Sequence, residues 1–324
     1  MITETDRSRT VRSAIELALR APSVHNSQPW RWRVGHDTVH LYADLARWLR
    51  ATDPDGRDLV VSCGAALHHL RVALSASGLR ATVHRLPNPA DGDHLASVEI
   101  HAGTCADRDL TLAGAIPLRR TDRRPFDDWP VPDAFVDELT AAAIAEGAHL
   151  RRIDPPWRAT VVGALGRAAH EQSELPGYDT ELALWSGART GPDGVPAANL
   201  LADPAAAGPT ARRFSPGELA VHADAPADGA ALLILATTSD DPLSQLRAGE
   251  ALSAVTLRAV DLGLATCPLS TPLEVGSTRS ILCEDVLGGS MMPQLVLRVG
   301  WPPAGPLPAT PRRPLFDVVG RLGD

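Results

Sequence analysis

The spacing of hydrophobic and polar residues predicts helices and strands along most of the chain. Helices are expected where apolar residues return every three or four positions, and strands where apolar residues alternate with polar ones or form short runs. The helical spacing covers residues 9–20, 59–77, 134–145, 157–174 and 249–262. The strand patterns cover residues 30–34, 39–42, 82–86, 95–100, 231–237 and 295–299. A mixture of this kind predicts an α+β fold.

Two segments follow neither pattern. Residues 186–229 are rich in Gly, Pro, Ala and Asp. A loop this long inside a compact protein is usually a functional lid or a disordered insert, and the pattern leaves both interpretations open. The Pro-rich residues 302–314 are expected to close the chain.

A short sequence pattern occurs twice. Gly64-Ala-Ala-Leu is followed by Gly78, and Gly249-Glu-Ala-Leu is followed at the same distance by Gly263. In both places a predicted helix runs between the glycines and a short strand comes next. One interpretation is coincidence, because glycine commonly ends helices. The other is a duplicated unit whose two copies pack together as the subunits of a dimer do.

Composition limits the classes of protein. A chain of 324 residues has room for two modest domains or one large core. Its 44% hydrophobic and 22% charged residues are typical of a soluble globular protein. The net charge of −8 provides no overall basic field, so neither nucleic acid nor an acidic membrane is expected as a partner. Because the chain contains no lysine, any anion it binds must meet arginine guanidinium groups.

The cysteines and the N-terminus predict the compartment. The four cysteines show no CxxC or other close metal-type spacing, so buried free thiols in a reducing compartment are expected. The N-terminal residues MITETD lack the basic and apolar regions of a signal peptide. No apolar run approaches the ~20 residues of a membrane span. We therefore expect a soluble, cytoplasmic protein.

Residues 21–30 (APSVHNSQPW) form the most informative loop. Its two prolines fix the backbone, and Ser, His, Asn and Gln between them can donate or accept hydrogen bonds. Such a loop suits the edge of a flat heteroaromatic ring such as a flavin. The alternative is a polar connection that caps the preceding helix, with His25 serving structure alone.

Arginines form a second candidate site. Residues 119–124 read RRTDRR, and guanidinium groups with a hydroxyl between them match the oxygens of a phosphate. Arg312 and Arg313 can add positive charge. The alternative for each cluster is a solvated surface patch. His68 and His69 are not expected to bind metal, because adjacent helical residues point to different sides. Phosphate-binding P-loops, Gly-rich dinucleotide fingerprints and GxSxG motifs do not occur.

Together these segments resemble the nitroreductase superfamily, most closely its fused, single-chain Acg-type branch, over most of the chain. In that superfamily an Arg-Arg-Ser-x-Arg block holds the FMN phosphate, an Ala-Pro-Ser-x-x-Asn-x-Gln-Pro-Trp loop holds the flavin ring, and a Gly-Leu-x-x-Cys-Pro-Leu stretch lies beneath its reactive edge. The resemblance implies FMN as the cofactor and no bound metal. The residues it assigns to FMN are Pro22, Ser23, His25, Asn26, Gln28, Arg119, Thr121, Arg123, Pro268, Leu269, Ser270, Arg312 and Arg313.

The order of the matched blocks differs from that of a dimeric relative. Residues 1–115 contain the ring loop without a phosphate block. Residues 116–324 contain the phosphate block and a lid at about residues 186–229, without a ring loop. Combining the two halves gives one complete site. The resemblance therefore implies two nitroreductase-like halves that form a pseudo-dimer within one chain and bind one FMN.

Two functions follow from the resemblance. The first is an NAD(P)H-dependent oxidoreductase that passes hydride from FMN to a small electron-poor acceptor, a nitroaromatic or a quinone, with chemistry centred on the flavin rather than on a catalytic side chain. The second is non-enzymatic FMN storage beneath a lid around residues 191–196. A third interpretation, from the arginines alone, is a phosphate-binding module without flavin. Ser270-Thr271 also departs from the Glu-Gly pair common in dimeric nitroreductases.

Overall fold

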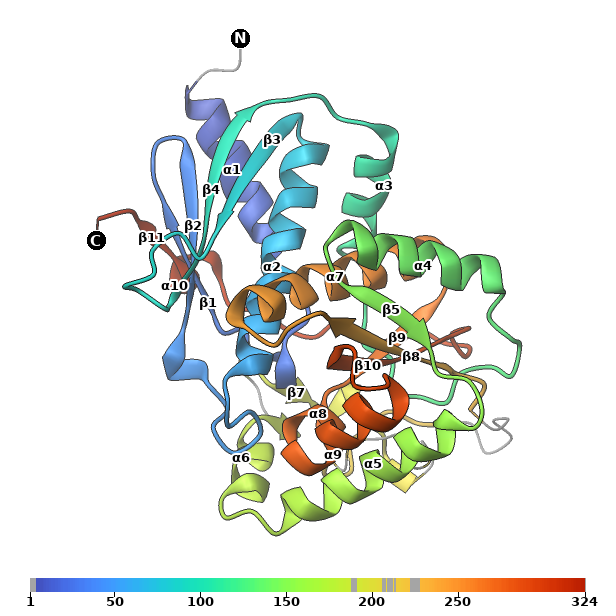
Figure 1. Cartoon of the computed structure of the whole chain (residues 1–324). Coiled ribbons are helices and arrows are strands. Elements are labelled where there is room, and N and C mark those ends of the chain that lie inside the picture. The colour runs from blue at the N-terminus through green and yellow to red at the C-terminus, as the bar shows by residue number, and fades with distance from the viewer. Residues whose placement is uncertain are drawn as a thin grey trace.

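Two β-sheets lie on either side of a central pair of helices in the computed structural model, which describes residues 4–187, 191–205, 208, 212, 214–221 and 228–323 (Figure 1). The first sheet has the strand order β11-β1-β2-β4-β3. Its strands are β1 (Trp30–Val34), β2 (Thr38–Ala43), β3 (Leu79–Arg85), β4 (His94–Ala102) and β11 (Val319–Arg321). The apolar positions of this sheet, including Trp30, Trp32 and Leu41, pack against the helices α1 (Glu4–Ala18) and α2 (Arg57–Ala76). The α3 helix (Asp107–Ala115) leads from this sheet to the second.

The second sheet has the antiparallel order β5-β8-β10-β9. Its strands are β5 (His149–Arg152), β8 (Ala231–Thr237), β9 (Ala265–Leu269) and β10 (Met292–Gly300). The buried side chains of β8 alternate between two cores, as the two-residue period of a strand requires. One core contains residues of α4 (Asp133–Ala145) and α7 (Pro242–Asp261), and the other contains residues of α5 (Trp157–Ser173). Shorter elements are α6 (Tyr178–Leu184), β6 (Ser186–Gly187), β7 (Val195–Pro196), α8 (Thr271–Glu274), α9 (Gly276–Ile281) and α10 (Leu315–Val318).

The C-terminal segment crosses back to the first half of the chain. After β10 the chain runs through the Pro-rich residues to α10 and β11, and β11 pairs in parallel with β1, so that Val319 lies beside Trp32 (Figure 1). The expectation that residues 302–314 close the chain is therefore wrong. The boundary between two halves at residues 115 and 116 stays a prediction. It assigns β11 to the second half, although β11 pairs with β1 in the first sheet.

The α+β prediction and all of the predicted helices and strands are confirmed, with shifted ends. The largest shift is in α7, which begins at Pro242 instead of residue 249. Asp241 caps this helix by accepting a hydrogen bond from the Ser244 N–H over 2.8 Å, and proline suits the first helical position. The predicted irregular segment 186–229 includes β6 and β7, and part of it (188–190, 206–207, 209–211, 213 and 222–227) lies outside the described residues.

Among the described helices, α2 alone reaches the length and hydropathy of a membrane span. However, 78% of its apolar window is buried inside the protein. It packs between the first sheet and α7, as the core helix of a globular protein does. The cytoplasmic location stays a prediction.

Candidate functional site

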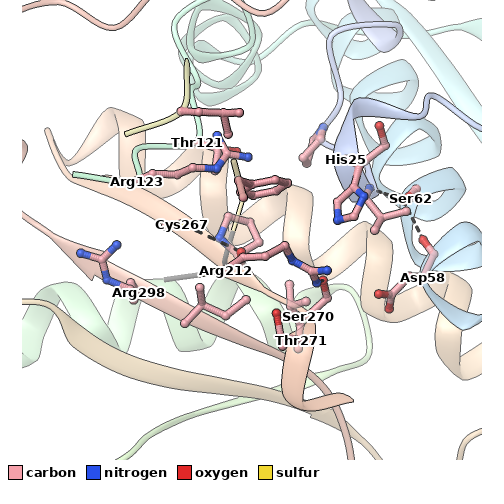
Figure 2. A pocket seen from close by; sticks show the side chains of 18 of the residues that line it. His25, Asp58, Ser62, Thr121, Arg123, Arg212, Cys267, Ser270, Thr271 and Arg298 are labelled. Atoms are coloured by element: carbon pink, nitrogen blue, oxygen red, sulfur yellow. Dashed lines mark hydrogen bonds between the residues drawn. The ribbon is translucent and has the colours of Figure 1, made fainter. Parts of the chain in front are cut away.

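A cavity of about 1020 Å³, part of it open to solvent, is lined by residues between 22 and 62 and by residues between 121 and 298. Its walls come from the ring loop at residues 22–25, the first turns of α2, the block at residues 121–123 and the β9–α8 junction (Figure 2). The irregular segment adds Leu200, Leu201, Pro204, Arg212, Phe214 and Ser215. The expected FMN residues that line it are Pro22, Ser23, His25, Thr121, Arg123, Pro268, Leu269 and Ser270. Segments about 240 residues apart in the sequence therefore meet in one place.

The ring loop holds a strained backbone. His25, Asn26 and Gln28 have φ angles of 46°, 54° and 51°, in the left-handed region that non-glycine residues rarely adopt. Two hydroxyl groups hold the loop: Ser23 Oγ accepts from the Gln28 N–H over 3.0 Å, and Ser62 Oγ accepts from the Val24 N–H over 3.1 Å. Such strain persists where the surroundings fix the conformation, so this loop presents a preformed surface to the cavity.

Asn26 and Gln28 do not line the cavity. The Asn26 amide donates to the carbonyls of Gly194, over 2.9 Å, and Pro311, over 3.1 Å. The Gln28 side chain donates to the Pro192 carbonyl over 2.9 Å and accepts from the Arg313 N–H over 2.8 Å. These amides therefore attach the ring loop to residues 192–194 and to the C-terminal segment.

His25 faces the cavity as a neutral ring. Its two ring nitrogens are buried and have no hydrogen-bond partner among the described residues, and its ring meets the Phe214 ring edge-on at 5.5 Å. Burial lowers the pKa of His25 well below its usual value, and the nearby Arg212 and Arg123 lower that pKa further. The free ring nitrogens can bond to a ligand.

The arginine block divides into two parts. Arg124 pairs with Asp122 at 2.7 Å, which makes this pair structural. Thr121 forms a bridge to Thr266 of β9, and Arg123 lies 5.3 Å from the centre of the Phe214 ring. Thr121 and Arg123 thus reach the cavity while their neighbours hold the block in place.

Arg119 is buried and Arg312 is half-buried, and neither cation has a carboxylate partner among the described residues. Arg119 is 5% exposed, and its Nε and Nη1 atoms have no partner. Arg312 donates to backbone carbonyls and to the Thr310 hydroxyl, which leaves its Nε free. Burial lowers the pKa of Arg119 to about 10 and that of Arg312 to about 9, with Arg20 and Arg120 adding positive charge. We call Arg20, Arg119, Arg120 and Arg312 the arginine cluster.

Arg313 lies outside this cluster. It pairs with Asp44 at 3.4 Å and donates to the carbonyls of Gln28 and Asp317. Its contacts fasten the C-terminal segment against the ring loop.

Several residues of the cavity wall were not predicted from the sequence. Asp58 and Ser62, one turn apart on α2, face it, as does Leu252 of α7. Arg212 enters it from the irregular segment, near Ser270 (Figure 2). It bonds to Tyr178, Ser270 and Glu274. Helical spacing would have placed Asp58 and Ser62 on one face of α2, whereas no pattern in the segment around Arg212 indicates its position.

Among the described residues, no group of His, Cys, Asp or Glu could hold a metal ion. His68 and His69 both bond to the Ser253 hydroxyl of α7 at 2.7 Å, so this pair joins two helices. The four cysteines are free thiols, as predicted. Cys63 and Cys267 are buried, but Cys105 is exposed, so the expectation of burial is wrong there.

The chain belongs to the nitroreductase family: a family model described as "Nitroreductase family" matches residues 117–301, which is more than half of it. "Putative NAD(P)H nitroreductase Rv3131" of Mycobacterium tuberculosis is 45% identical, with 98% of this chain and 93% of the relative covered. "Putative NAD(P)H nitroreductase acg" of the same organism is 38% identical, with 95% and 94% covered. The resemblance to the nitroreductase family and its Acg-type members is confirmed.

Solved structures of nitroreductases also match, more distantly. The FMN and NADPH-dependent nitroreductase NfnB from "sphigopyxis sp. strain HMH" is 18% identical, with a TM-score of 0.43 over 66% of this chain and 99% of that chain. A nitroreductase with bound FMN from Bacteroides fragilis is 13% identical, with a TM-score of 0.39 over 61% of this chain and 91% of that chain.

Proposed function

We propose that the chain binds one FMN between its two halves, with the flavin ring in the cavity and the phosphate at the arginine cluster. The observation that carries this proposal is the burial of Arg119 without a carboxylate partner among the described residues. An unpaired buried charge is strongly destabilising, and a bound anion relieves it. The titles of two solved nitroreductase structures that this chain resembles name FMN, which supports FMN as the bound anion.

The residues of the site fit the three parts of FMN. Arg119, Thr121 and Arg312 would hold the phosphate through charge-assisted hydrogen bonds. Arg123 and His25 would contact the middle and the ring edge. The ring loop and residues 268–270, which both line the cavity, would contact the flavin ring. Asn26, Gln28 and Arg313 would act indirectly, by fixing the ring loop.

The first activity we propose is that of an NAD(P)H-dependent oxidoreductase. Bound FMN supplies hydride transfer, and the protein supplies orientation and access. The family and the relatives named as NAD(P)H nitroreductases support this activity. The cavity walls include Leu200, Leu269 and Phe214 and suit a flat apolar acceptor, for which we propose a nitroaromatic or a quinone.

We also infer that the chain is an internal pseudo-dimer. The α2 and α7 helices are each 20 residues long, and each is followed by a glycine in the left-handed region, Gly78 at φ 73° and Gly263 at φ 76°, and then by a strand. The two helices pack against each other at the centre of the protein (Figure 1). These matches favour duplication over coincidence for the repeated Gly-Leu pattern.

FMN storage is the second function we consider, because a segment of the chain covers the cavity. Leu200, Leu201, Arg212, Phe214 and Ser215 all line it, and Arg212 connects this segment to Tyr178 of α6 and Glu274 of α8. We propose that these five residues belong to the lid. These residues lie within the predicted lid segment 186–229. Gly194 and Pro192, in the part around residues 191–196, contact the ring loop through Asn26 and Gln28. A lid that stays closed would exclude nicotinamide from the flavin.

Anaerobic mixing of the FMN-loaded protein with NADPH distinguishes the two functions. Bleaching of the flavin absorbance band within seconds, followed by recovery on addition of a nitroaromatic, supports the oxidoreductase. A flavin band that persists for minutes at saturating NADPH supports storage and contradicts the oxidoreductase. Photoreduction of the same sample shows that its flavin is redox-competent.

A further inference from the structure

Asp58 is a buried carboxyl group at the wall of the cavity. It lies in the first turn of α2, is 3% exposed and extends toward Arg212 and Ser270 (Figure 2). One of its oxygens, Oδ1, accepts a hydrogen bond from Arg57. The other, Oδ2, is buried and has no hydrogen-bond partner among the described residues. A buried oxygen without a partner in a cavity wall indicates a missing ligand contact.

The charges around Asp58 do not balance unless one carboxyl carries a proton. Among the described residues that interact with it, three carboxyl groups (Asp53, Asp58 and Glu274) face two guanidinium groups (Arg57 and Arg212). Burying an excess negative charge is costly, and in practice one group binds a proton.

The hydrogen bonds show which carboxyl that is. Asp53 accepts from the backbone N–H groups of Asp58, over 3.0 Å, and Leu59, over 2.9 Å, which favours its charged form. Glu274 accepts from Arg212 and from Gln172. Only Asp58 among the three has an oxygen with no donor, so the proton belongs on Asp58 Oδ2.

Electrostatics agree with this assignment. Burial raises the pKa of Asp58 to about 8, although Arg57 and Arg212 act in the opposite direction, and the carboxylates of Asp53 and Glu274 raise that pKa further. Two other groups in the cavity wall are also neutral, because burial lowers the pKa of His25 and raises the pKa of the Cys267 thiol. The guanidinium groups of Arg123 and Arg298 line the wall as well. Asp58 is therefore a neutral acid with a free O–H near pH 7.

We propose that Asp58 is a hydrogen-bond donor of the flavin-ring site and that its neutral carboxyl group bonds to an acceptor atom of the bound ring. This inference rests on the proposed FMN binding. The edge of the ring carries carbonyl oxygens and ring nitrogens that accept such a bond, and a charged carboxylate in the same place would repel them. Ser62, whose hydroxyl donates to the Asp58 carbonyl and accepts from the Val24 N–H, links this donor to the ring loop.

The test is the affinity for FMN at pH 7 and pH 9, measured by flavin fluorescence on wild type, D58N and D58L. For wild type we expect the affinity to fall roughly five- to tenfold at pH 9, because Asp58 ionises. For D58N we expect the same affinity at pH 7 and at pH 9, equal to that of wild type at pH 7. The amide keeps an N–H donor and cannot ionise. For D58L we expect weaker binding at both values. Glu171→Gln, which changes a half-exposed carboxyl group on α5 outside the cavity wall, is the matched control and should behave as wild type.

A direct measurement covers the case in which a variant folds poorly. The infrared spectrum of wild type at pH 7 should contain the C=O band of a protonated carboxyl group that disappears at pH 9. Absence of this band, or an equal loss of affinity in wild type and D58N at pH 9, would overturn the role of Asp58 while FMN binding stands. If wild type fails to bind FMN at either pH, the proposed function fails and this inference with it.

Discussion

Gly64 of α2 and Gly249 of α7 lie against each other with no space for a side chain on either. A Cβ atom on Gly64 would lie 2.0 Å from the carbonyl oxygen of Leu246, and one on Gly249 would lie 2.0 Å from that of Val61. In each case the carbonyl belongs to the residue three positions before the opposite glycine. This reciprocity is what a two-fold axis between duplicated helices produces, and it lies beside the cavity where the halves meet.

We expect Gly64→Ala to destabilise the protein by roughly 1–3 kcal/mol or more, because the added methyl group meets rigid backbone. The free energy of unfolding, measured by urea denaturation, checks this. Gly163→Ala is the control, since Gly163 is exposed within α5 and its added Cβ meets nothing within 4 Å. It should leave stability unchanged or raise it by up to about 1 kcal/mol. Equal effects of the two substitutions would show that the close helix crossing is incorrect.

Arg119→Met should weaken FMN binding without destabilising the apoprotein. A charge-assisted phosphate contact contributes ~1.5–3 kcal/mol, or roughly ten- to a hundredfold in affinity. Loss of a buried, unpaired charge should leave the apoprotein as stable as before or more so. Arg124→Met is the matched comparison, because Arg124 pairs with Asp122 and its removal should lower stability. A destabilised Arg119→Met protein with normal FMN affinity would make Arg119 structural.

Tyr178→Phe should speed the release of FMN. The Tyr178 hydroxyl accepts from Arg212 Nη1 over 3.0 Å and so helps to hold the proposed lid. Loss of one such bond should raise the dissociation rate by roughly tenfold, as measured by flavin transfer to an excess of an acceptor flavoprotein. The other tyrosine, Tyr42, stacks on His94 in the first sheet, and Tyr42→Phe should release FMN at the wild-type rate. Identical rates for both variants would contradict a lid held at this point.

The stability of the apoprotein should depend on pH through Asp58. Burial raises the pKa of Asp58 to about 8, above the ~3.9 of an unfolded chain. A group with a raised folded pKa adds stability that is present below pH 4 and is lost as the pH rises toward 8. The difference in unfolding free energy between wild type and D58N should therefore shift against wild type by at least about 1 kcal/mol from pH 5 to pH 8. If the urea midpoints of wild type and D58N change by the same amount from pH 5 to pH 8, Asp58 does not cause the pH dependence.

Local signals in the sequence predicted most of the elements. The alternation in residues 30–34 is sufficient for β1, because one face of that strand packs on α1 and α2. The short elements α6 and β5 were not predicted, since four to seven residues give little periodicity. The Asp-Pro pair at residues 241–242 is a helix-start signal and marks the beginning of α7, whereas the apolar spacing alone places that beginning at residue 249.

The site could be predicted only in part. Thr121 and His25 were found because each belongs to a contiguous motif with a physical role. Pairing of β11 with β1 depends on contacts between the two ends of the chain, which no local pattern encodes. No local pattern indicates that Arg212 reaches Ser270 from an irregular segment. Nor does one indicate that Asp58 Oδ2 lacks a hydrogen-bond partner among the described residues. The roles of Asn26 and Gln28 in holding the ring loop also depend on such distant contacts.

The count of flavins per chain tests the central claim most directly. The protein is saturated with FMN, freed of excess by gel filtration and denatured, and the released flavin is measured by absorbance against the protein concentration. The proposed pseudo-dimer, with one ring loop and one phosphate block, predicts one FMN per chain. Two FMN per chain, or none retained, would contradict the account.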